Sequence, residues 1–299
     1  MGLGTTNALA WVVVSLFAAS AVLSYADREV AARSLAAATW VVFAVFWALL
    51  LPHFWFVEKS VIETVLIAAA VPGCVYVAYL VYASRPSLMV LSRAVAAMGL
   101  IYLPALTIEP VSRALITATT TEGAWLQRAL GYHPTVVTGP TSQSAHVGFP
   151  HAFVYVTHGN PYLLEILLAC TGMGSISLVA GVIIALDAPL RRRLYGLLVA
   201  VPVIYALNVV RISFIAMAHG NQWFSGPLAT RFVALVFSPH QSHIASYYIA
   251  DRVISQSLSV VALAGITLVL LRVLPELGTV VSDLLYVATG REYDVAVSR

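Results

Sequence analysis

The chain has 299 residues, of which 60% are hydrophobic and only 10% are charged, and its mean hydropathy is +0.89. Soluble globular proteins carry about 25% charged residues, so this composition excludes a soluble fold and indicates a polytopic membrane protein. The formal net charge is +3, but the basic residues follow a membrane-topology pattern, so we expect no nucleic-acid partner. Two cysteines are too few for a disulfide framework or a four-thiolate zinc site, and we expect no metal or other cofactor.

Seven apolar runs are each long enough to cross a bilayer, which takes about 20 helical residues. They are residues 7–24, 35–57, 61–82, 88–107, 162–186, 194–217 and 246–273. We therefore expect an all-α integral membrane protein with about seven transmembrane helices in a single polytopic domain. Its expected parts are a four-helix N-terminal part (1–107), an outer loop (108–161), the catalytic helices (162–273) and a tail (274–299).

The basic residues predict how these helices are oriented. Cytoplasmic loops of membrane proteins carry an excess of Lys and Arg. Ten of the 16 Lys and Arg residues fall in or beside alternate loops and the tail, namely Arg28, Arg33, Arg85, Arg93, Arg191, Arg192, Arg193, Arg272, Arg291 and Arg299. With an odd number of spans, this pattern places the N-terminus outside, the C-terminus inside and loop 108–161 on the outer side.

The outer loop is expected to be ordered and to lie over the membrane surface. Residues 111–130, VSRALITATTTEGAWLQRAL, have the pattern of an amphipathic helix. Residues 131–148 are rich in Gly, Pro, Ser and Thr, which predicts turns. Residues 149–162, FPHAFVYVTHGNPY, are rich in Phe, Val and Tyr, which predicts an extended segment or hairpin.

Three polar or reactive side chains are expected at similar depth in the membrane. If the run 162–186 is one helix, Cys170 lies eight residues from its outer end, or roughly 12 Å below the outer boundary. Arg211 lies near the outer end of the sixth run, and Arg252 near the outer end of the seventh. The predicted topology therefore brings Cys170, Arg211 and Arg252 together in the outer third of the membrane.

The two arginines have a functional and a structural interpretation. An arginine at the centre of a span costs about 2.5 to 3.5 kcal/mol, so such residues usually face a protein interior and mark a functional site. Near the end of a helix, however, the long side chain can also reach the interface without any further role. Asn208 precedes Arg211 by three residues, so the two side chains share a helix face and form a donor-rich patch.

Cys170 is also open to two interpretations. A cysteine in an apolar run is usually a small packed side chain, and Cys74 is interpreted in that way. Cys170 differs because Gly172 and Gly174 permit close approach of a backbone or a substrate, and because two guanidinium groups nearby are expected to lower its pKa. Glu165 is expected either to pair with one of the arginines or to remain a solvated carboxylate at the interface.

The motifs around these residues resemble those of the exosortase/archaeosortase family of integral-membrane transpeptidases, and among them the archaeosortases. The resemblance rests on LLACTG at 167–172, NVVR at 208–211 and HIASYYIADR at 243–252. It implies that Cys170 is the nucleophile and Arg211 the first essential arginine. For the third residue of the site, the resemblance allows either Arg252 or His243, and we favour Arg252.

The resemblance also implies a function. Members of this family process exported proteins that end in a tripartite signal, made of a Pro-Gly-Phe-type motif, a transmembrane helix and a basic cytoplasmic tail. Cleavage near the outer face of the cell membrane is linked to attachment of the new C-terminus to a membrane lipid. The implied partners are therefore exported proteins and a lipid acceptor, and His158, His219 and His243 are candidates for proton transfer.

Two other classes of membrane protein remain alternatives. A small-molecule or ion transporter also carries arginines within its spans, but it typically shows two related halves, which this sequence lacks. An intramembrane metalloprotease or serine protease needs a motif such as H-E-x-x-H or G-x-S-x-G, and neither is present. The sequence therefore favours a cysteine transpeptidase, without identifying its substrates, its lipid acceptor or its oligomeric state.

Overall fold

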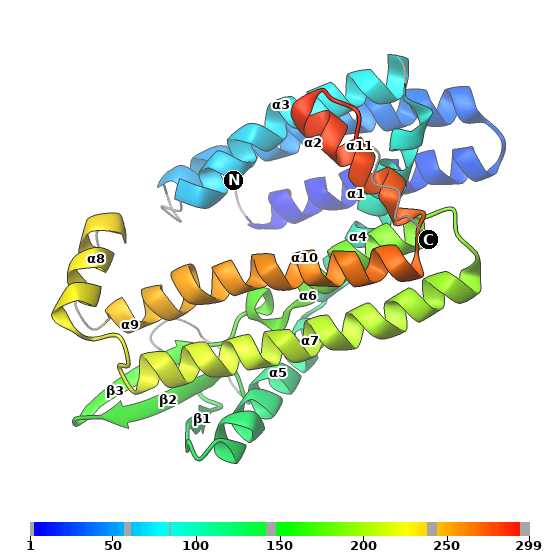
Figure 1. The fold of residues 1–299 in the computed structure, drawn as a ribbon. Coiled ribbons are helices and arrows are strands. Elements are labelled where there is room, and N and C mark those ends of the chain that lie inside the picture. The colour runs from blue at the N-terminus through cyan, green and yellow to red at the C-terminus, as the bar shows by residue number, and fades with distance from the viewer. Residues whose placement is uncertain (1–2, 57–60, 84, 142–147, 238–243, 294–299) are drawn as a thin grey trace. The chain divides into compact units, whose positions relative to one another are not determined.

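The computed structural model describes residues 3–56, 61–83, 85–141, 148–237 and 244–293, and most of these residues are helical (Figure 1). Within these ranges, six helices are long and apolar enough to cross a membrane. They are Thr6–Tyr25 in α1 (Leu3–Tyr25), Glu29–Phe56 (α2), Thr64–Ala83 in α3 (Val61–Ala83), Met89–Thr107 (α4), Leu190–Gly220 (α7) and Ala245–Val273 (α9 to α10).

The chain divides into two compact units. The first comprises Met1–Leu103, Ser177–Leu198 and Leu270–Arg299, and the second comprises Pro104–Ile176 and Val199–Val269. Helices α7 and α10 (Gln256–Val273) each have one end in the first unit and the other in the second. Every candidate site residue that the structure describes lies in the second unit.

An apolar core holds the first unit together. The ring of Phe17 on α1 packs edge-on against that of Trp40 on α2, with 5.2 Å between their centroids. The indole Nε1 of Trp40 donates a hydrogen bond of 2.9 Å to the Ser92 hydroxyl on α4, so this buried polar atom is satisfied. Cys74 on α3 is buried in the same core, in agreement with its interpretation as a packing residue.

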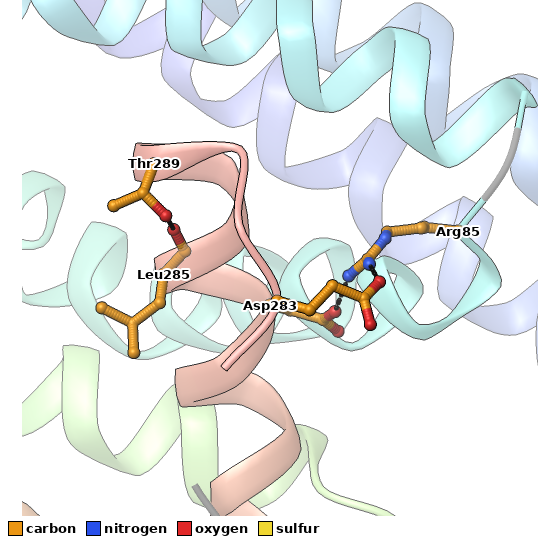
Figure 2. Close-up of polar contacts among 5 residues, drawn as sticks. Arg85, Asp283, Leu285 and Thr289 are labelled. Carbon is orange, nitrogen blue, oxygen red and sulfur yellow. Dashed lines mark hydrogen bonds and ion pairs between the residues drawn. The ribbon is translucent and has the colours of Figure 1, made fainter. Parts of the chain in front are cut away.

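Arginines expected on the inner side are paired with carboxylates in the first unit. Arg85 follows α3 and binds Asp283 of α11 (Leu277–Thr289) at 3.0 Å (Figure 2). Its guanidinium also pairs with Glu292 and lies 3.6 Å from the centre of the Tyr286 ring. These contacts attach α11 to the short helix η1 (Pro86–Leu88) and to α3, so the tail contains an ordered helix.

The second unit contains the elements of the predicted outer loop. The amphipathic segment forms α5 (Glu109–Ala129), as predicted. A three-stranded antiparallel sheet follows, in the order β1 (Thr135–Val137), β2 (Ala152–Thr157) and β3 (Asn160–Glu165). The predicted hairpin is confirmed as β2–β3, and its two turn residues, His158 and Gly159, both have positive φ, as a type I′ turn requires.

Buried polar contacts join this sheet to the helices of the second unit. The Tyr155 hydroxyl on β2 donates a hydrogen bond of 2.6 Å to Gln127 on α5. The Thr157 hydroxyl donates one of 2.7 Å to the carbonyl of Gly220, the last residue of α7. A Cβ at Gly220 would lie within 2.3 Å of the Tyr155 ring, so only glycine permits this close packing. The sheet and the end of α7 thus form one framework around the site.

The prediction that residues 162–186 form one membrane-spanning helix is wrong. The segment begins in β3, continues through the short helix η2 (Leu168–Thr171), and becomes α-helical only at α6 (Met173–Ala185). The 13 residues of α6 extend about 20 Å, less than the hydrocarbon thickness of about 30 Å. Cys170 therefore lies in a turn between a strand and a helix, outside the six helices long enough to span a membrane.

Candidate active site

Cys170 sits in the turn of η2, where local hydrogen bonds fix its backbone. Its N–H donates to the Leu167 carbonyl at 2.8 Å. The hydroxyl of the next residue, Thr171, donates to the Leu168 carbonyl at 2.7 Å. The Cys170 side chain is partly buried and packs against a core that includes Ile166 and Ile212. The thiol is thus held on a rigid turn against the core of the second unit.

Asn208 connects this turn to α7. Its side-chain amide donates a hydrogen bond of 2.7 Å to the carbonyl of Cys170. Gly172 ends the turn with φ of +76°, a left-handed conformation that only glycine adopts without strain. A Cβ added at Gly172 would lie 3.0 Å from Cβ and Cγ of Asn208. Asn208, expected only to support the site, therefore binds the backbone of the candidate nucleophile directly.

Replacing Gly172 by alanine is expected to destabilise the protein and to slow its reaction. Forcing a side chain into the left-handed conformation costs about 1 to 3 kcal/mol, and the new methyl group also crowds Asn208. Gly174→Ala is the matched control, because a Cβ there meets no atom within 4 Å. Thermal unfolding midpoints in detergent should fall for Gly172→Ala and stay near wild type for Gly174→Ala. Equal midpoints for the two variants would contradict this role of Gly172.

Arg211 follows Asn208 on the same face of α7, as predicted, and carries an ion pair. Its Nη2 lies 2.8 Å from Oδ1 of Asp251. Arg252 is adjacent to Asp251, and its Nε lies 3.6 Å from Oδ2 of the same carboxylate. Asp251 therefore pairs with both predicted arginines, although it was not among the predicted site residues. A carboxylate within a membrane span is about as costly as an arginine, so the position of Asp251 in the run 246–273 was the signal that could have identified it.

Asp251 and Arg252 lie in an unusual helical segment. Between α9 (Ala245–Tyr248) and α10, residues Ile249–Ser255 form a π-helix, η4. Such wide turns are rare and frequently occur at functional sites. Nothing in the hydropathy of the span 246–273 predicted this change of helix type.

Burial and nearby charges act in opposite directions on Cys170. Burial raises the pKa of its thiol and is the largest cause of the shift. A hydrogen bond with the Leu167 backbone and the positive charge of Arg211 lower the pKa of the thiol. The negative charge of Asp251 raises it. The net direction is upward, so the expectation of a lowered pKa is wrong for the substrate-free protein. A raised pKa lowers the fraction of thiolate at a given pH, and that fraction grows as the pH rises.

Glu165 does not reach an arginine among the residues that the structure describes. It is the last residue of β3 and is buried, and its Oε2 accepts a hydrogen bond of 3.4 Å from the Thr141 hydroxyl. The interpretation of Glu165 as an arginine partner is therefore not supported by the described contacts. Glu165 ends β3, and the chain continues from it into η2, which contains Cys170.

Of the two histidine candidates that the structure describes, His219 lies nearer to the site. His219, near the end of α7, is buried between Tyr162 and Tyr247, with ring centroids 5.6 and 5.8 Å away. Tyr247 in turn interacts with the carboxylate of Asp251 and with the sulfur of Cys170. His158 is exposed in the β2–β3 turn. His243 falls outside the described residues. His219 thus contacts a tyrosine that interacts electrostatically with the thiol.

Carboxylate, thiol and imidazole groups do not gather into a metal site in the part of the chain that the structure describes, where no three of them lie close enough to hold an ion. The arrangement offers instead one thiol, two guanidinium groups and the carboxylate between them. Such a set is suited to nucleophilic attack on a carbonyl, with cationic donors for the developing oxyanion.

Comparison with known proteins agrees with the motifs. The family model of transmembrane exosortases matches residues 5–237. The chain is 43% identical to archaeosortase A of Haloferax volcanii, covering 97% of this chain and 96% of that protein. It is 40% identical to archaeosortase A of Natronomonas pharaonis, covering 94% and 88%. No solved structure matches the chain. The chain therefore belongs to the exosortase family of integral-membrane proteins.

Proposed function

We propose that this protein is a membrane-embedded cysteine transpeptidase that cleaves the C-terminal tripartite signal of exported proteins. The two relatives named archaeosortase A support a role in protein sorting. The observation that carries the proposal is the meeting of three sequence-distant segments at one thiol. Asn208 of α7 binds the Cys170 backbone, and the charges of Arg211 and Asp251 both act on the Cys170 sulfur.

In the proposed reaction, the sulfur of Cys170 attacks the scissile carbonyl of the substrate. A sulfur–carbon bond forms, the thiol proton is released, and the carbon–nitrogen bond breaks as the leaving amine gains a proton. The product is a thioester to Cys170 and a free C-terminal helix. An amine-bearing lipid then attacks the thioester, forms an amide and returns the thiol.

Arg211 is proposed to stabilise the oxyanion of this reaction. Its Nη2 is engaged by Asp251, whereas its Nε–H has no hydrogen-bond partner among the described residues. A guanidinium held on one side by a carboxylate retains donors for a substrate oxygen on the other. Tyr247 and His219 are the side chains proposed to take part in the proton transfers, since Tyr247 interacts electrostatically with Cys170 and the His219 ring packs edge-on against that of Tyr247.

The proposed location of the site follows from the positive-inside pattern. We propose that Cys170 lies near the outer face of the cell membrane, because the positive-inside rule assigns the basic loops to the cytoplasm. A substrate helix with a basic tail inside would place the Pro-Gly-Phe-type motif at its outer end, near this thiol. The proposed orientation of the enzyme across the membrane is thus compatible with that of the substrate helix.

A reporter carrying the tripartite signal tests the proposed function. Expressed in cells with and without this enzyme, it should lose its C-terminal helix only in cells that contain the enzyme, and a mass spectrum should show a lipid on the new C-terminus. A reporter whose Pro-Gly-Phe-type motif is replaced by alanines is the control and should keep its helix. Equal processing of both reporters would contradict the proposed substrate class.

A further inference from the structure

Asp251 is the carboxylate that lies between the two arginines of the site. One oxygen is 2.8 Å from Nη2 of Arg211, and the other is 3.6 Å from Nε of Arg252. The Asp251 side chain is 13% exposed, compared with 35% for Arg211 and 34% for Arg252. The carboxylate is therefore the most buried member of the group.

Two guanidinium groups on neighbouring helical segments repel each other. A carboxylate paired with both offsets this repulsion, and its 2.8 Å hydrogen bond limits the rotation of Arg211. The π-helical turn Ile249–Ser255 presents Asp251 and Arg252 next to each other on the side that meets Arg211.

We propose that Asp251 is the positioning residue of the reaction, and that its carboxylate, shared by Arg211 and Arg252, sets the orientation of both guanidinium groups. This inference rests on the proposed transpeptidase function. Asp251 does not react with the substrate itself. It acts through the two arginines.

The same carboxylate has a second, opposite effect on Cys170. The groups that face the thiol are Arg211, Asp251 and Tyr247. The negative charge of Asp251 raises the pKa of the thiol, and Arg211 lowers it. Removing the charge of Asp251 therefore makes the thiol more acidic, while it releases the arginines from their positions. If Asp251 only stabilised the fold, removing its charge would not both lower the pKa of the thiol and release the arginines.

The variant Asp251→Asn tests this inference, because asparagine has nearly the same shape but no charge. In lipid-reconstituted enzyme, kcat for a peptide carrying the tripartite signal is expected to fall about 100-fold, since misplacing a catalytic group by about 1 Å has an effect of this size. KM should change little. The pH profile for alkylation of Cys170 by iodoacetamide, measured in a Cys74→Ala background without substrate, should shift to lower pH than in the wild type.

Two further variants serve as controls. Asp251→Glu keeps the charge, so its alkylation profile should stay near that of the wild type and its kcat should exceed that of Asp251→Asn. Asp187→Asn makes the same chemical change at another arginine-paired aspartate, 2.7 Å from Arg93 in the first unit, and should alter neither quantity. Thermal unfolding midpoints establish that each variant is folded.

Unchanged kcat in Asp251→Asn would overturn the inference. A reduced kcat with an unchanged alkylation profile would also overturn it, since Asp251 would then act through folding alone. The alkylation measurement needs no cleavage, so it remains informative if Cys170 proves not to be the nucleophile. Failure of the proposed function and failure of the inference are therefore distinguishable.

Discussion

Replacement of Cys170 by alanine or by serine is expected to abolish cleavage of a tripartite-signal substrate. Alanine removes the nucleophile, and serine replaces it with a hydroxyl that is a far weaker nucleophile without a dedicated base. Loss of an enzyme's nucleophile typically reduces kcat by about 1000-fold or more. The measurement is the rate of release of the C-terminal helix by purified enzyme in lipid vesicles.

Cys74→Ala is the matched control for this prediction. Cys74 is the other cysteine of the chain, and it is buried in the apolar core of the first unit. Its replacement leaves a small cavity and is expected to lower stability slightly without changing kcat. Cleavage by Cys170→Ala at the wild-type rate would exclude Cys170 as the nucleophile.

Replacement of Arg211 by lysine is expected to reduce kcat about 100-fold, the usual effect of removing one oxyanion donor. Lysine keeps the positive charge, but its ammonium group cannot bind Asp251 on one side and offer donors in a fixed plane on the other. Catalysis should therefore fall although the local charge is unchanged. Cleavage kinetics in lipid vesicles give both kcat and KM.

Arg85→Lys is the control, because Arg85 also pairs with an aspartate, Asp283 at 3.0 Å, but lies in the first unit. This substitution is expected to lower the unfolding midpoint slightly, through weaker attachment of α11, and to leave kcat near wild type. If Arg211→Lys and Arg85→Lys had the same modest effect, Arg211 would be a structural ion-pair residue without a catalytic role.

Patterns of apolar residues predicted much of the fold. Helix α5 and the β2–β3 hairpin follow from periodicity and from residue types that favour strands. The run 162–186 was misassigned because hydropathy counts apolar side chains and carries no information on strand pairing. Tyr162 pairs with Tyr155, and Leu163 with Val154, so these residues are apolar because they belong to a packed sheet.

The site was predictable where it depends on helical spacing. Asn208 and Arg211 share a face of α7, and both reach partners around Cys170 or Asp251. The role of Asp251 was not predictable in this way, because it depends on a π-helical turn that hydropathy does not reveal. The direction of the pKa shift of Cys170 was missed because the sequence shows the charges but not the depth of burial, which has the larger effect.

Trapping the enzyme–substrate intermediate tests the proposed chemistry most directly. Wild-type enzyme is mixed with a peptide carrying the tripartite signal, without any amine acceptor, and quenched in acid for intact-protein mass spectrometry. We predict an adduct with the mass of the N-terminal peptide fragment, attached to Cys170 and released by hydroxylamine. Cleavage without any such adduct, or an adduct at another residue, would contradict a thioester mechanism at Cys170.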